Sequence, residues 1–223
     1  MESQFPQEML CRIERTGIIA VLVIEEPRHA VPTARALLAG GIDSMELVLR
    51  TPAALESLGE ICRQVPEMLA GAGTVLTEEQ VDQVCDAGAA YAVAPGLNPR
   101  TVERACSQGL PFAPGVMTPS DIEAAIELGC RELKFFPAEP VGGIQYLTSL
   151  YVPYQHLGLR FLPLGGLNTS QLESYLAAPA TLAVGGTWLA RPEMIAAEDW
   201  QTITQRARQA REIVDLIRQG DPQ

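Results

Sequence analysis

The chain contains a single lysine, Lys134, among its 16 lysine and arginine residues. A lysine amine can attack a ketone and form a Schiff base, whereas an arginine guanidinium stays protonated and cannot. Lys134 lies in the apolar run Arg131-Glu132-Leu133-Lys134-Phe135-Phe136-Pro137. The alternative is that Lys134 is an ordinary surface lysine in an arginine-rich chain. This explanation fits the sequence less well, because a surface lysine rarely precedes two phenylalanines. The sequence therefore indicates a buried, reactive amine on a strand.

A glutamate and an arginine lie at strand positions from which they can meet this lysine. In the run 44–50 one set of alternating positions is entirely apolar, and Glu46 and Arg50 belong to the other set. Side chains alternate between the two faces of a strand, so these two should face away from the helices. The same alternation in the run 132–136 puts Lys134 inside. A purely structural ion pair is the alternative, but burying three charges for stability alone competes poorly with apolar filling.

Glycine pairs follow two later strand-like runs, as Leu164-Gly165-Gly166 and Gly185-Gly186-Thr187-Trp188. In a barrel of parallel strands, the loops after strands seven and eight commonly bind phosphate through backbone N–H groups and a short helix. Two glycine pairs at these places predict a site for phosphate or a similar anion. The segments Gly71-Ala72-Gly73-Thr74 and Ala94-Pro95-Gly96 end earlier strands, and turn chemistry alone explains them.

Short apolar runs alternate with amphipathic stretches along the whole chain. Strands are predicted at 17–24, 44–50, 68–72, 91–94, 111–114, 132–136, 160–163 and 181–184. Helices are predicted at 27–39, 52–64, 78–87, 99–108, 119–128, 143–150, 170–177 and 198–218. Eight strands alternating with eight helices are typical of an α/β protein with a (β/α)8 TIM barrel. An extra helix at 7–15 is expected to cover one end.

Local signals support this division of the chain. Thr51-Pro52, Asn98-Pro99 and Thr118-Pro119 each place a capping side chain before a proline, which suits the first turn of a helix. An open doubly wound sheet is the competing fold, but no G-x-G-x-x-G follows the first strand. No linker interrupts the pattern, so residues 1–223 are expected to form a single barrel domain. Helix stop signals are at Gly88, Gly109 and Gly129.

The overall composition narrows the function. A net charge of −11 argues against nucleic-acid binding, which needs a basic face. No apolar run is long enough to span a membrane. The five cysteines have no spacing typical of a metal site or a disulfide framework, and the polar N-terminal segment does not resemble a signal peptide. The composition therefore favours a soluble cytoplasmic protein, for which we expect no metal and no cofactor.

These segments resemble the KDPG/KHG aldolase family, which cleaves 2-keto-3-deoxy-6-phosphogluconate (KDPG) and 4-hydroxy-2-oxoglutarate (KHG). They run in the family's order and cover almost the whole chain, and the lysine segment is the most specific. The matching segments are His29-Ala30-Val31-Pro32, Glu46-Leu47-Val48-Leu49-Arg50-Thr51, Gly71-Ala72-Gly73-Thr74-Val75, Ala94-Pro95-Gly96-Leu97, Lys134-Phe135-Phe136-Pro137-Ala138-Glu139 and Gly185-Gly186-Thr187-Trp188-Leu189.

The resemblance implies a metal-free class I aldolase that assembles as a homotrimer. Lys134 matches the Schiff-base lysine and Glu46 matches the general acid/base. The implied substrate is a keto acid, most simply KDPG, which gives pyruvate and glyceraldehyde 3-phosphate; KHG would give pyruvate and glyoxylate. The remaining matches hold pyruvate (Arg50, Thr74, Pro95, Phe136) or the phosphate (Gly165, Gly166, Gly185, Gly186, Thr187).

Two positions depart from the family's pattern. Leu164 stands where the phosphogluconate enzymes commonly have threonine near the substrate hydroxyls, and Met117-Thr118 stands where Ser-Thr is common. A 2-keto-3-deoxy-6-phosphogalactonate aldolase therefore remains an alternative, as does an unphosphorylated keto acid. Two readings without imine chemistry are also open, a phosphate-binding barrel isomerase or epimerase and a non-catalytic sugar-phosphate sensor.

Overall fold

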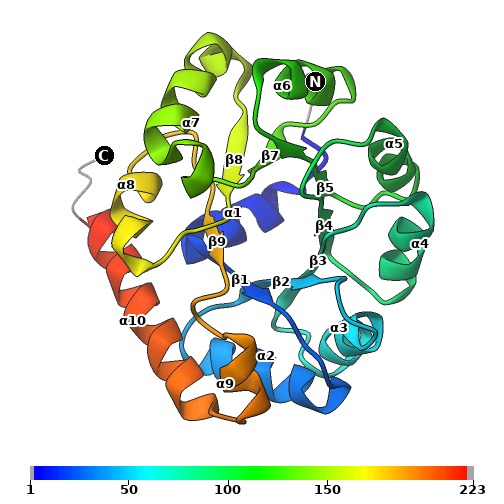
Figure 1. Cartoon of the computed structure of the whole chain (residues 1–223), viewed down its shortest axis with the longest axis vertical. Helices are drawn as coiled ribbons and strands as arrows, with labels where there is room; N and C mark the ends of the chain where they lie inside the picture. Colours follow the sequence, from blue (N-terminus) through cyan, green and yellow to red (C-terminus); the bar gives the residue numbers. More distant parts are fainter. Residues whose placement is uncertain (1–2, 220–223) are drawn as a thin grey trace.

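The computed structural model describes residues 3–219, and its strands form a closed ring (Figure 1). The strands are β1 (Ile18–Leu22), β2 (Ser44–Val48), β3 (Leu69–Gly73), β4 (Tyr91–Val93), β5 (Phe112–Ala113), β6 (Gly115–Val116), β7 (Glu132–Phe135), β8 (Arg160–Pro163) and β9 (Val184–Gly186). All paired strands are parallel, in the orders β5-β4-β3-β2-β1-β9 and β6-β7-β8. Isolated bridges Phe161–Thr181 and Leu164–Gly185 join β8 to the β9 segment, which closes the predicted TIM-like barrel.

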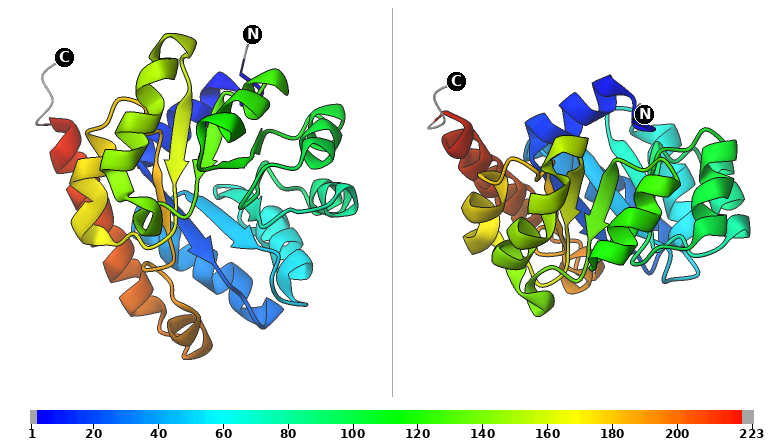
Figure 2. Two further views of the ribbon diagram at one scale, coloured as in Figure 1. Left: turned by 45° about the horizontal axis from the view of Figure 1, so that its top comes forward. Right: turned by 90° about the horizontal axis from the view of Figure 1, so that it is seen from above.

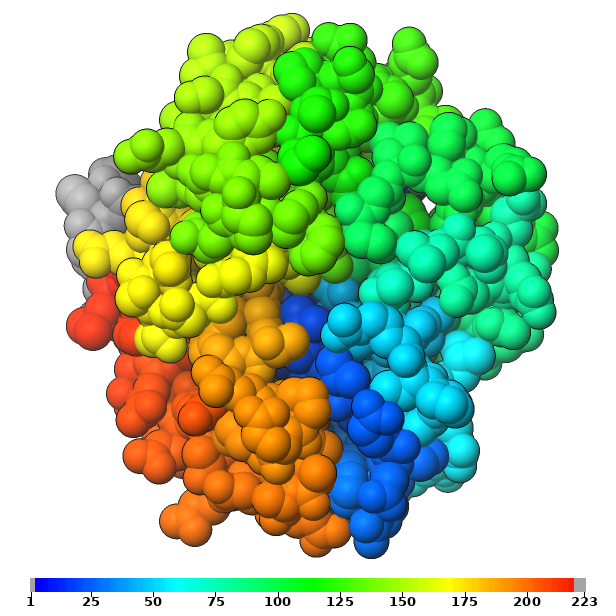
Figure 3. Space-filling model, in the orientation of Figure 1, coloured from blue at the N-terminus to red at the C-terminus, as the bar shows by residue number. Residues whose placement is uncertain are grey.

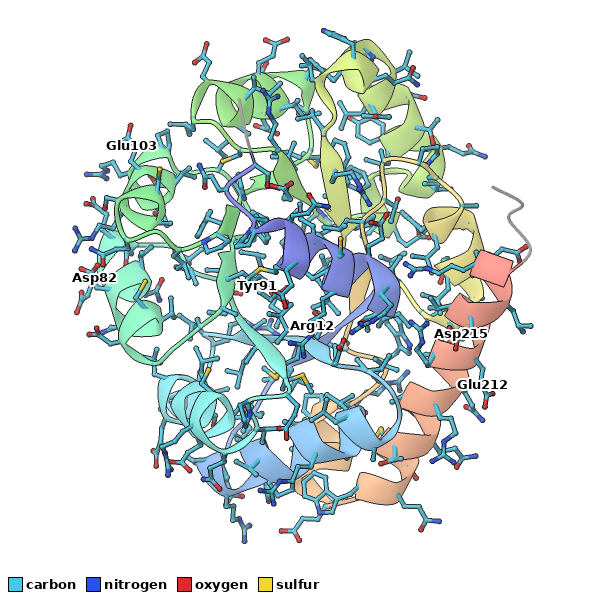
Figure 4. The ribbon with its side chains drawn as sticks, turned by 180° about the vertical axis from the view of Figure 1, so that it is seen from behind. Arg12, Asp82, Tyr91, Glu103, Glu212 and Asp215 are labelled. Carbon is cyan, nitrogen blue, oxygen red and sulfur yellow. The ribbon has the colours of Figure 1, made fainter. Side chains whose placement is uncertain are left out.

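Helices surround the ring on its outside, and one further helix crosses an end (Figure 2). The helices are α1 (Gln7–Thr16), α2 (Ala30–Ala39), α3 (Ala54–Gln64), α4 (Glu78–Asp86), α5 (Pro99–Ser107), α6 (Pro119–Glu127), α7 (Gly143–Tyr151), α8 (Leu172–Leu176), α9 (Pro192–Ala196) and α10 (Trp200–Gln219). Short 3-10 turns are η1 (Pro27–His29), η2 (Glu139–Val141), η3 (Val152–Leu157) and η4 (Thr169–Gln171). Helix α1 lies across the amino-terminal ends of the strands, as predicted (Figure 4).

The strands separate two apolar cores, and the alternation predicted for β2 and β7 is confirmed. Met45, Leu47, Leu133 and Phe135 pack in the outer core between strands and helices. Val48 packs in the inner core with residues of β1, β4 and β8. Because alternate side chains fill opposite cores, Glu46 and Lys134 are placed in the barrel interior, where both are almost fully buried.

Two strands differ from prediction by more than one or two residues at an end. The fifth barrel strand is broken at Pro114, which cannot donate a backbone hydrogen bond, into β5 and β6. The last strand is Val184–Gly186 rather than 181–184, because the glycines pair with β1 while Thr181 makes only a bridge. The glycine pair thus belongs partly to the ring itself, and it does not simply form the loop after it.

Helix starts were predicted well where a side chain could cap them. Asn98 caps α5 and Thr118 caps α6 in a capping box with Asp121. The prediction for Thr51 was wrong, because α3 begins after Ala53 and the Thr51 hydroxyl donates instead to the Ile24 carbonyl at 2.5 Å. The predicted stop glycines at 88, 109 and 129 all have positive φ angles, as a left-handed helix end requires. The short α9 was not predicted.

The first described residues close the amino-terminal end of the barrel. The Ser3 hydroxyl donates a 2.8 Å hydrogen bond to the buried carboxylate of Glu132, at the start of β7. Phe5 is buried, and its ring lies 6.2 Å from that of Tyr91 between ring centroids. Figure 4 shows Tyr91 beneath α1 on this side. A ligand must therefore enter the interior from the opposite end of the barrel.

Glu132→Gln is expected to change the pH dependence of stability. Burial raises the pKa of Glu132 more than the Ser3 hydrogen bond and the charge of Arg160 lower it. The folded state therefore binds this proton more tightly than the unfolded state does. Stability is lost as pH rises from the pKa of the unfolded state, about 4.3, through the raised pKa of the folded state. The variant should thus gain stability relative to wild type as pH rises above the unfolded-state pKa, measured by urea unfolding. A pH-independent difference would contradict this assignment.

Candidate active site

The amine and carboxylate predicted to act together are in direct contact. Lys134 Nζ donates a 2.9 Å hydrogen bond to Glu46 Oε1, and the two side chains are only 6% and 2% exposed. Lys134 Nζ also lies 5.5 Å from the centre of the Phe136 ring. A buried ion pair contributes little net stability, because desolvating two charges offsets their attraction. The pair therefore indicates a chemical role.

A cavity of about 420 Å³ opens above this pair at the carboxyl ends of the strands. The segments that line it meet around the centre of the face in Figure 3. Every site residue selected from the sequence lies in its wall. Those residues are Glu46, Arg50, Thr74, Pro95, Lys134, Phe136, Gly165, Gly166, Gly185, Gly186 and Thr187.

Strand β3 makes room for the pair by contributing glycines to the interior. A Cβ on Gly73 would lie 1.9 Å from Glu46 Oε1, so the carboxylate occupies the space that a side chain would need. One layer below, a Cβ on Gly71 would lie 2.3 Å from the Tyr91 ring. The Tyr91 hydroxyl donates to the Met45 carbonyl at 2.9 Å. Burial, together with the nearby Glu46 carboxylate, raises the Tyr91 pKa, so the phenol stays neutral beneath the pair.

Gly73→Ala is expected to reduce kcat/KM for aldol cleavage by about 10²-fold, since a displacement of ~1 Å at a catalytic group can cost this much. The new methyl group must push the Glu46 carboxylate away from Lys134. Steady-state kinetics with the fold checked by circular dichroism measures the effect. Gly59→Ala is the matched control, because a Cβ there meets nothing within 4 Å and its helix α3 should be slightly stabilised. Equal activity in the two variants would refute the argument.

Thr74 and Arg50 add polar groups to the cavity wall. Thr74 follows Gly73 and has a φ of 61°, a left-handed conformation that costs energy for a β-branched residue. Such strain persists only where the surrounding structure imposes it, and here it places Thr74 in the cavity wall. Arg50 is exposed at the rim, just after β2. Its guanidinium makes no ion pair with any residue in the range 3–219, so it is available to an anionic ligand.

Hydrogen bonds from neighbouring residues hold the loop after β8 in place. Gly165 and Gly166 have φ angles of 98° and 82°, which glycine adopts without strain. Backbone N–H of Glu139 donates to the Gly165 carbonyl at 3.0 Å. The Tyr175 hydroxyl donates to Glu139 Oε1 at 2.7 Å, and burial with this carboxylate raises the Tyr175 pKa and keeps the donor protonated. The glycine loop is thus held in place before any ligand arrives.

The segment that contains β9 packs closely against neighbouring side chains. A Cβ on Gly185 would meet the Leu164 side chain at 2.6 Å, and one on Gly186 would meet the Trp188 ring at 1.8 Å. Only glycine allows these neighbours to pack so near the backbone. Leu164 lines the cavity, so an apolar side chain stands at the position where the resemblance implies threonine.

Sequence reasoning missed several residues of the wall. Arg191 and Asn168 lie beyond the ends of the matching segments, and the inward alternation of β1 was not used to select Val21. A signal for Arg191 was present, because a charged residue lies only five positions after Gly186. Within residues 3–219 no cluster of three or more His, Cys, Asp or Glu side chains suits a metal ion.

Comparison with known proteins decides the family. A family model described as KDPG and KHG aldolase matches residues 10–206. The chain belongs to the KDPG and KHG aldolase family. This aldolase is a carbon–carbon lyase, as the resemblance implied.

Relatives of the aldolase match along nearly their whole length. The 2-dehydro-3-deoxy-phosphogluconate aldolase of Treponema pallidum (strain Nichols) is 42% identical over 205 residues, covering 92% of this chain and 97% of that protein. The KHG/KDPG aldolase of Escherichia coli (strain K12) is 38% identical over 193 residues, covering 86% and 90%. These relatives support the same reaction class for the chain.

Solved structures of related aldolases share the barrel. A KDPG aldolase of Legionella pneumophila, with pyruvate captured at low pH as a covalent carbinolamine intermediate, has a TM-score of 0.86 at 35% identity and covers 90% of this chain and 97% of its own. The Zymomonas mobilis ZM4 enzyme with 3-phosphoglycerate has a TM-score of 0.83 at 36% identity, covering 92% and 96%. The helices described for this aldolase are all too short or too polar to cross a membrane.

Proposed function

We propose that the chain is a class I aldolase that cleaves KDPG to pyruvate and glyceraldehyde 3-phosphate through a Schiff base on Lys134. The observation that carries this proposal is the contact between the buried Lys134 amine and the Glu46 carboxylate at the base of the cavity. An amine next to a carboxylate can lose a proton to it and attack a ketone. KHG, which would yield pyruvate and glyoxylate, is a second substrate of the same chemistry.

The first half-reaction forms the imine. The Lys134 nitrogen attacks C2 of the keto acid, and the ketone oxygen takes up a proton to give a carbinolamine. Loss of water, with a proton delivered to the departing hydroxyl by Glu46, gives the iminium. The carbinolamine captured with pyruvate in the Legionella pneumophila aldolase is this kind of intermediate. The buried, enclosed base of the cavity keeps competing water away from the reacting atoms.

The groups around the lysine can hold the pyruvate portion of the substrate. Arg50 lies in the cavity wall, and its guanidinium can bind the C1 carboxylate through two parallel hydrogen bonds. Thr74 lies in the wall beside Glu46 and offers a hydroxyl donor to the same carboxylate. Pro95 and Phe136 supply apolar walls around the three-carbon unit, which suits a small keto acid.

Carbon–carbon cleavage follows from the iminium. Glu46 takes the proton of the C4 hydroxyl, through a bridging water, as the C3–C4 bond breaks. The electron pair of that bond moves into the iminium to give an enamine, and C4 leaves as an aldehyde. Protonation of C3 and hydrolysis of the resulting imine release pyruvate and return the Lys134 amine. No redox partner or metal is needed to balance these steps.

The glycine loops suit the distal phosphate of this substrate. Gly165 and Gly166 lie in the cavity wall next to Gly185, Gly186 and Thr187, because Leu164 and Gly185 form a bridge between the two segments. Backbone N–H groups free of side chains can approach an anion closely. A related chain with 3-phosphoglycerate supports a phosphorylated ligand for this barrel. The native KDPGal structure, at 27% identity and a TM-score of 0.81, keeps the phosphogalactonate substrate as the alternative.

The same proposal covers assembly and location. Residues 1–223 act as one (β/α)8 aldolase domain that forms a homotrimer in the cytoplasm. A trimer could cover some of the large apolar side chains that the described surface exposes, which are Leu76, Met117, Val152 and Leu216. Light scattering after size-exclusion chromatography measures the mass. A monomer at micromolar concentration would refute the trimer without touching the chemistry.

Borohydride reduction in the presence of pyruvate is the direct test of the imine. Intact mass followed by peptide mapping should find one pyruvate-derived adduct, on Lys134. Because the chain has a single lysine, only the N-terminal amine competes for reduction. An adduct on Lys134 would leave the aldehyde half to be identified. A folded protein with no adduct would refute the Schiff-base reaction and favour an isomerase or a sensor that uses the phosphate end alone.

A further inference from the structure

A second arginine stands at the glycine-loop side of the cavity, and the reaction derived above does not use it. Arg191 lines the cavity together with Gly186 and Thr187, five residues after the first of these. It directly precedes α9 and its side chain is exposed. Arg50 lies in the same wall, after β2, and only β1 separates β2 from β9 in the ring. The cavity therefore offers two arginines to an anionic ligand, and the reaction derived above gives a role to Arg50 alone.

No carboxylate is among the described residues that line the wall around Arg191, although the chain as a whole is strongly acidic. Glu46 is the only carboxylate among the described residues that line the cavity, and it pairs with Lys134. A smaller hollow of about 250 Å³ adjoins the cavity and is lined by Arg191, Arg206 and four uncharged residues. The whole chain has a net charge of −11. A carboxylate-free region with two arginines is thus suited to an anion.

The backbone around Arg191 is fixed while its guanidinium is not. Arg206 Nη1 donates to the Trp188 carbonyl at 2.9 Å, which ties this segment to α10. The Trp188 ring packs over Gly186, as the close approach there shows. Throughout residues 3–219, by contrast, no side-chain hydrogen bond or ion pair is made by Arg191. A fixed segment with a free guanidinium can bind a ligand without first breaking a contact in the protein.

We propose that Arg191 binds the distal phosphate and makes the aldolase selective for phosphorylated 2-keto-3-deoxy acids over unphosphorylated ones. This inference rests on the proposed function. The glycine N–H groups can donate to any oxygen, so they discriminate poorly between a phosphate and a hydroxyl. A guanidinium adds a full charge and a two-pronged donor geometry that matches phosphate. Selectivity for the phosphate therefore comes from Arg191 more than from the glycine loops.

Arg191→Gln tests this assignment through a ratio of two substrates. We expect kcat/KM for KDPG to fall about 10-fold, mainly through KM, as loss of a charged hydrogen bond at an exposed site implies. The value for unphosphorylated 2-keto-3-deoxygluconate should not change. Arg191→Lys should recover part of the loss. The matched control is Arg100→Gln, an exposed arginine on α5 with the same change in charge, which should leave both values unchanged.

An unchanged ratio between the two substrates would overturn the assignment. If neither value changes, Arg191 has no role in binding, and if both fall equally, the substitution acts on the structure and not on selectivity. Pyruvate trapping on Lys134 in wild type and variant separates this failure from failure of the proposed function. Calorimetric titration with inorganic phosphate adds a readout that needs no turnover. Binding should be weaker in Arg191→Gln, and equal binding would refute the phosphate contact.

Discussion

Lys134→Arg is expected to abolish aldol cleavage while leaving the barrel folded. Arginine keeps the positive charge next to Glu46, so the electrostatic balance of the interior is retained. A guanidinium stays protonated and cannot form the imine, so the covalent route is lost. Loss of a covalent nucleophile costs about 10⁶-fold in well-studied enzymes, and we expect at least about 10⁴-fold here. A coupled assay for pyruvate release measures the rate.

The same variant separates the two other classes of function. A barrel isomerase or a sugar-phosphate sensor needs only a cation at this place, so arginine should be tolerated. An aldolase needs the amine, and borohydride with pyruvate should then leave the variant unmodified at residue 134. Appreciable residual cleavage by Lys134→Arg would refute the Schiff-base mechanism. Lys134→Gln distinguishes loss of the amine from strain caused by the larger guanidinium, because glutamine is smaller and should be equally inactive.

Strand alternation explains why the centre of the site could be predicted from the sequence. A period of two residues fixes which side chains of β2 and β7 face the interior, so the sequence predicts that Glu46 and Lys134 lie together, as the structure shows. This alternation cannot be used for glycines, because they have no side chain that could be apolar or polar. Gly185 and Gly186 were assigned to a loop, yet they pair with β1 as the last strand. Gly185 and Gly186 thus belong to the ring, whereas Gly165 and Gly166 follow β8 as predicted.

Contacts between distant segments account for most of what the sequence could not show. The glycines of β3 are explained only by the side chains that fill their places, Tyr91 beside Gly71 and Glu46 beside Gly73. Nothing local in the chain reveals that these residues are neighbours. Thr51 illustrates the same limit. The sequence predicts that it caps a helix, but its hydroxyl donates a hydrogen bond to the distant Ile24 carbonyl. Local signals are reliable when no tertiary partner competes with them.

The charge distribution connects the two halves of the site. Burial of Lys134 and Glu46 is costly, and the cost is tolerable because each satisfies the other at 2.9 Å. A keto acid that binds beside them adds a carboxylate, and Arg50 and Thr74 lie in the wall to meet it. Formation of the iminium then places a fixed positive charge on the nitrogen, next to Glu46. The carboxylate therefore stabilises the intermediate as well as moving protons.

Glu46→Gln is expected to uncouple imine formation from bond cleavage. Glutamine keeps the size of the side chain and can still accept a hydrogen bond, but it cannot take a proton from the C4 hydroxyl. Loss of a general base costs about 10²–10⁴-fold, so kcat for KDPG cleavage should fall by this factor. Pyruvate should still be trapped on Lys134 by borohydride, at a slower rate. Single-turnover kinetics with parallel trapping measures both steps on one sample.

Glu132→Gln is the matched control for this variant, because the structure has a second buried carboxylate on the interior side. Glu132 starts β7 two residues before Lys134 and faces the closed end of the barrel, where Ser3 contacts it. Both substitutions remove one negative charge from the interior, but only Glu46 lies against the amine. If cleavage slows equally in both variants, the effect is one of interior charge and not of proton transfer. An unchanged rate in Glu46→Gln would remove Glu46 from the mechanism, whereas slowing in that variant alone assigns the proton to this carboxylate.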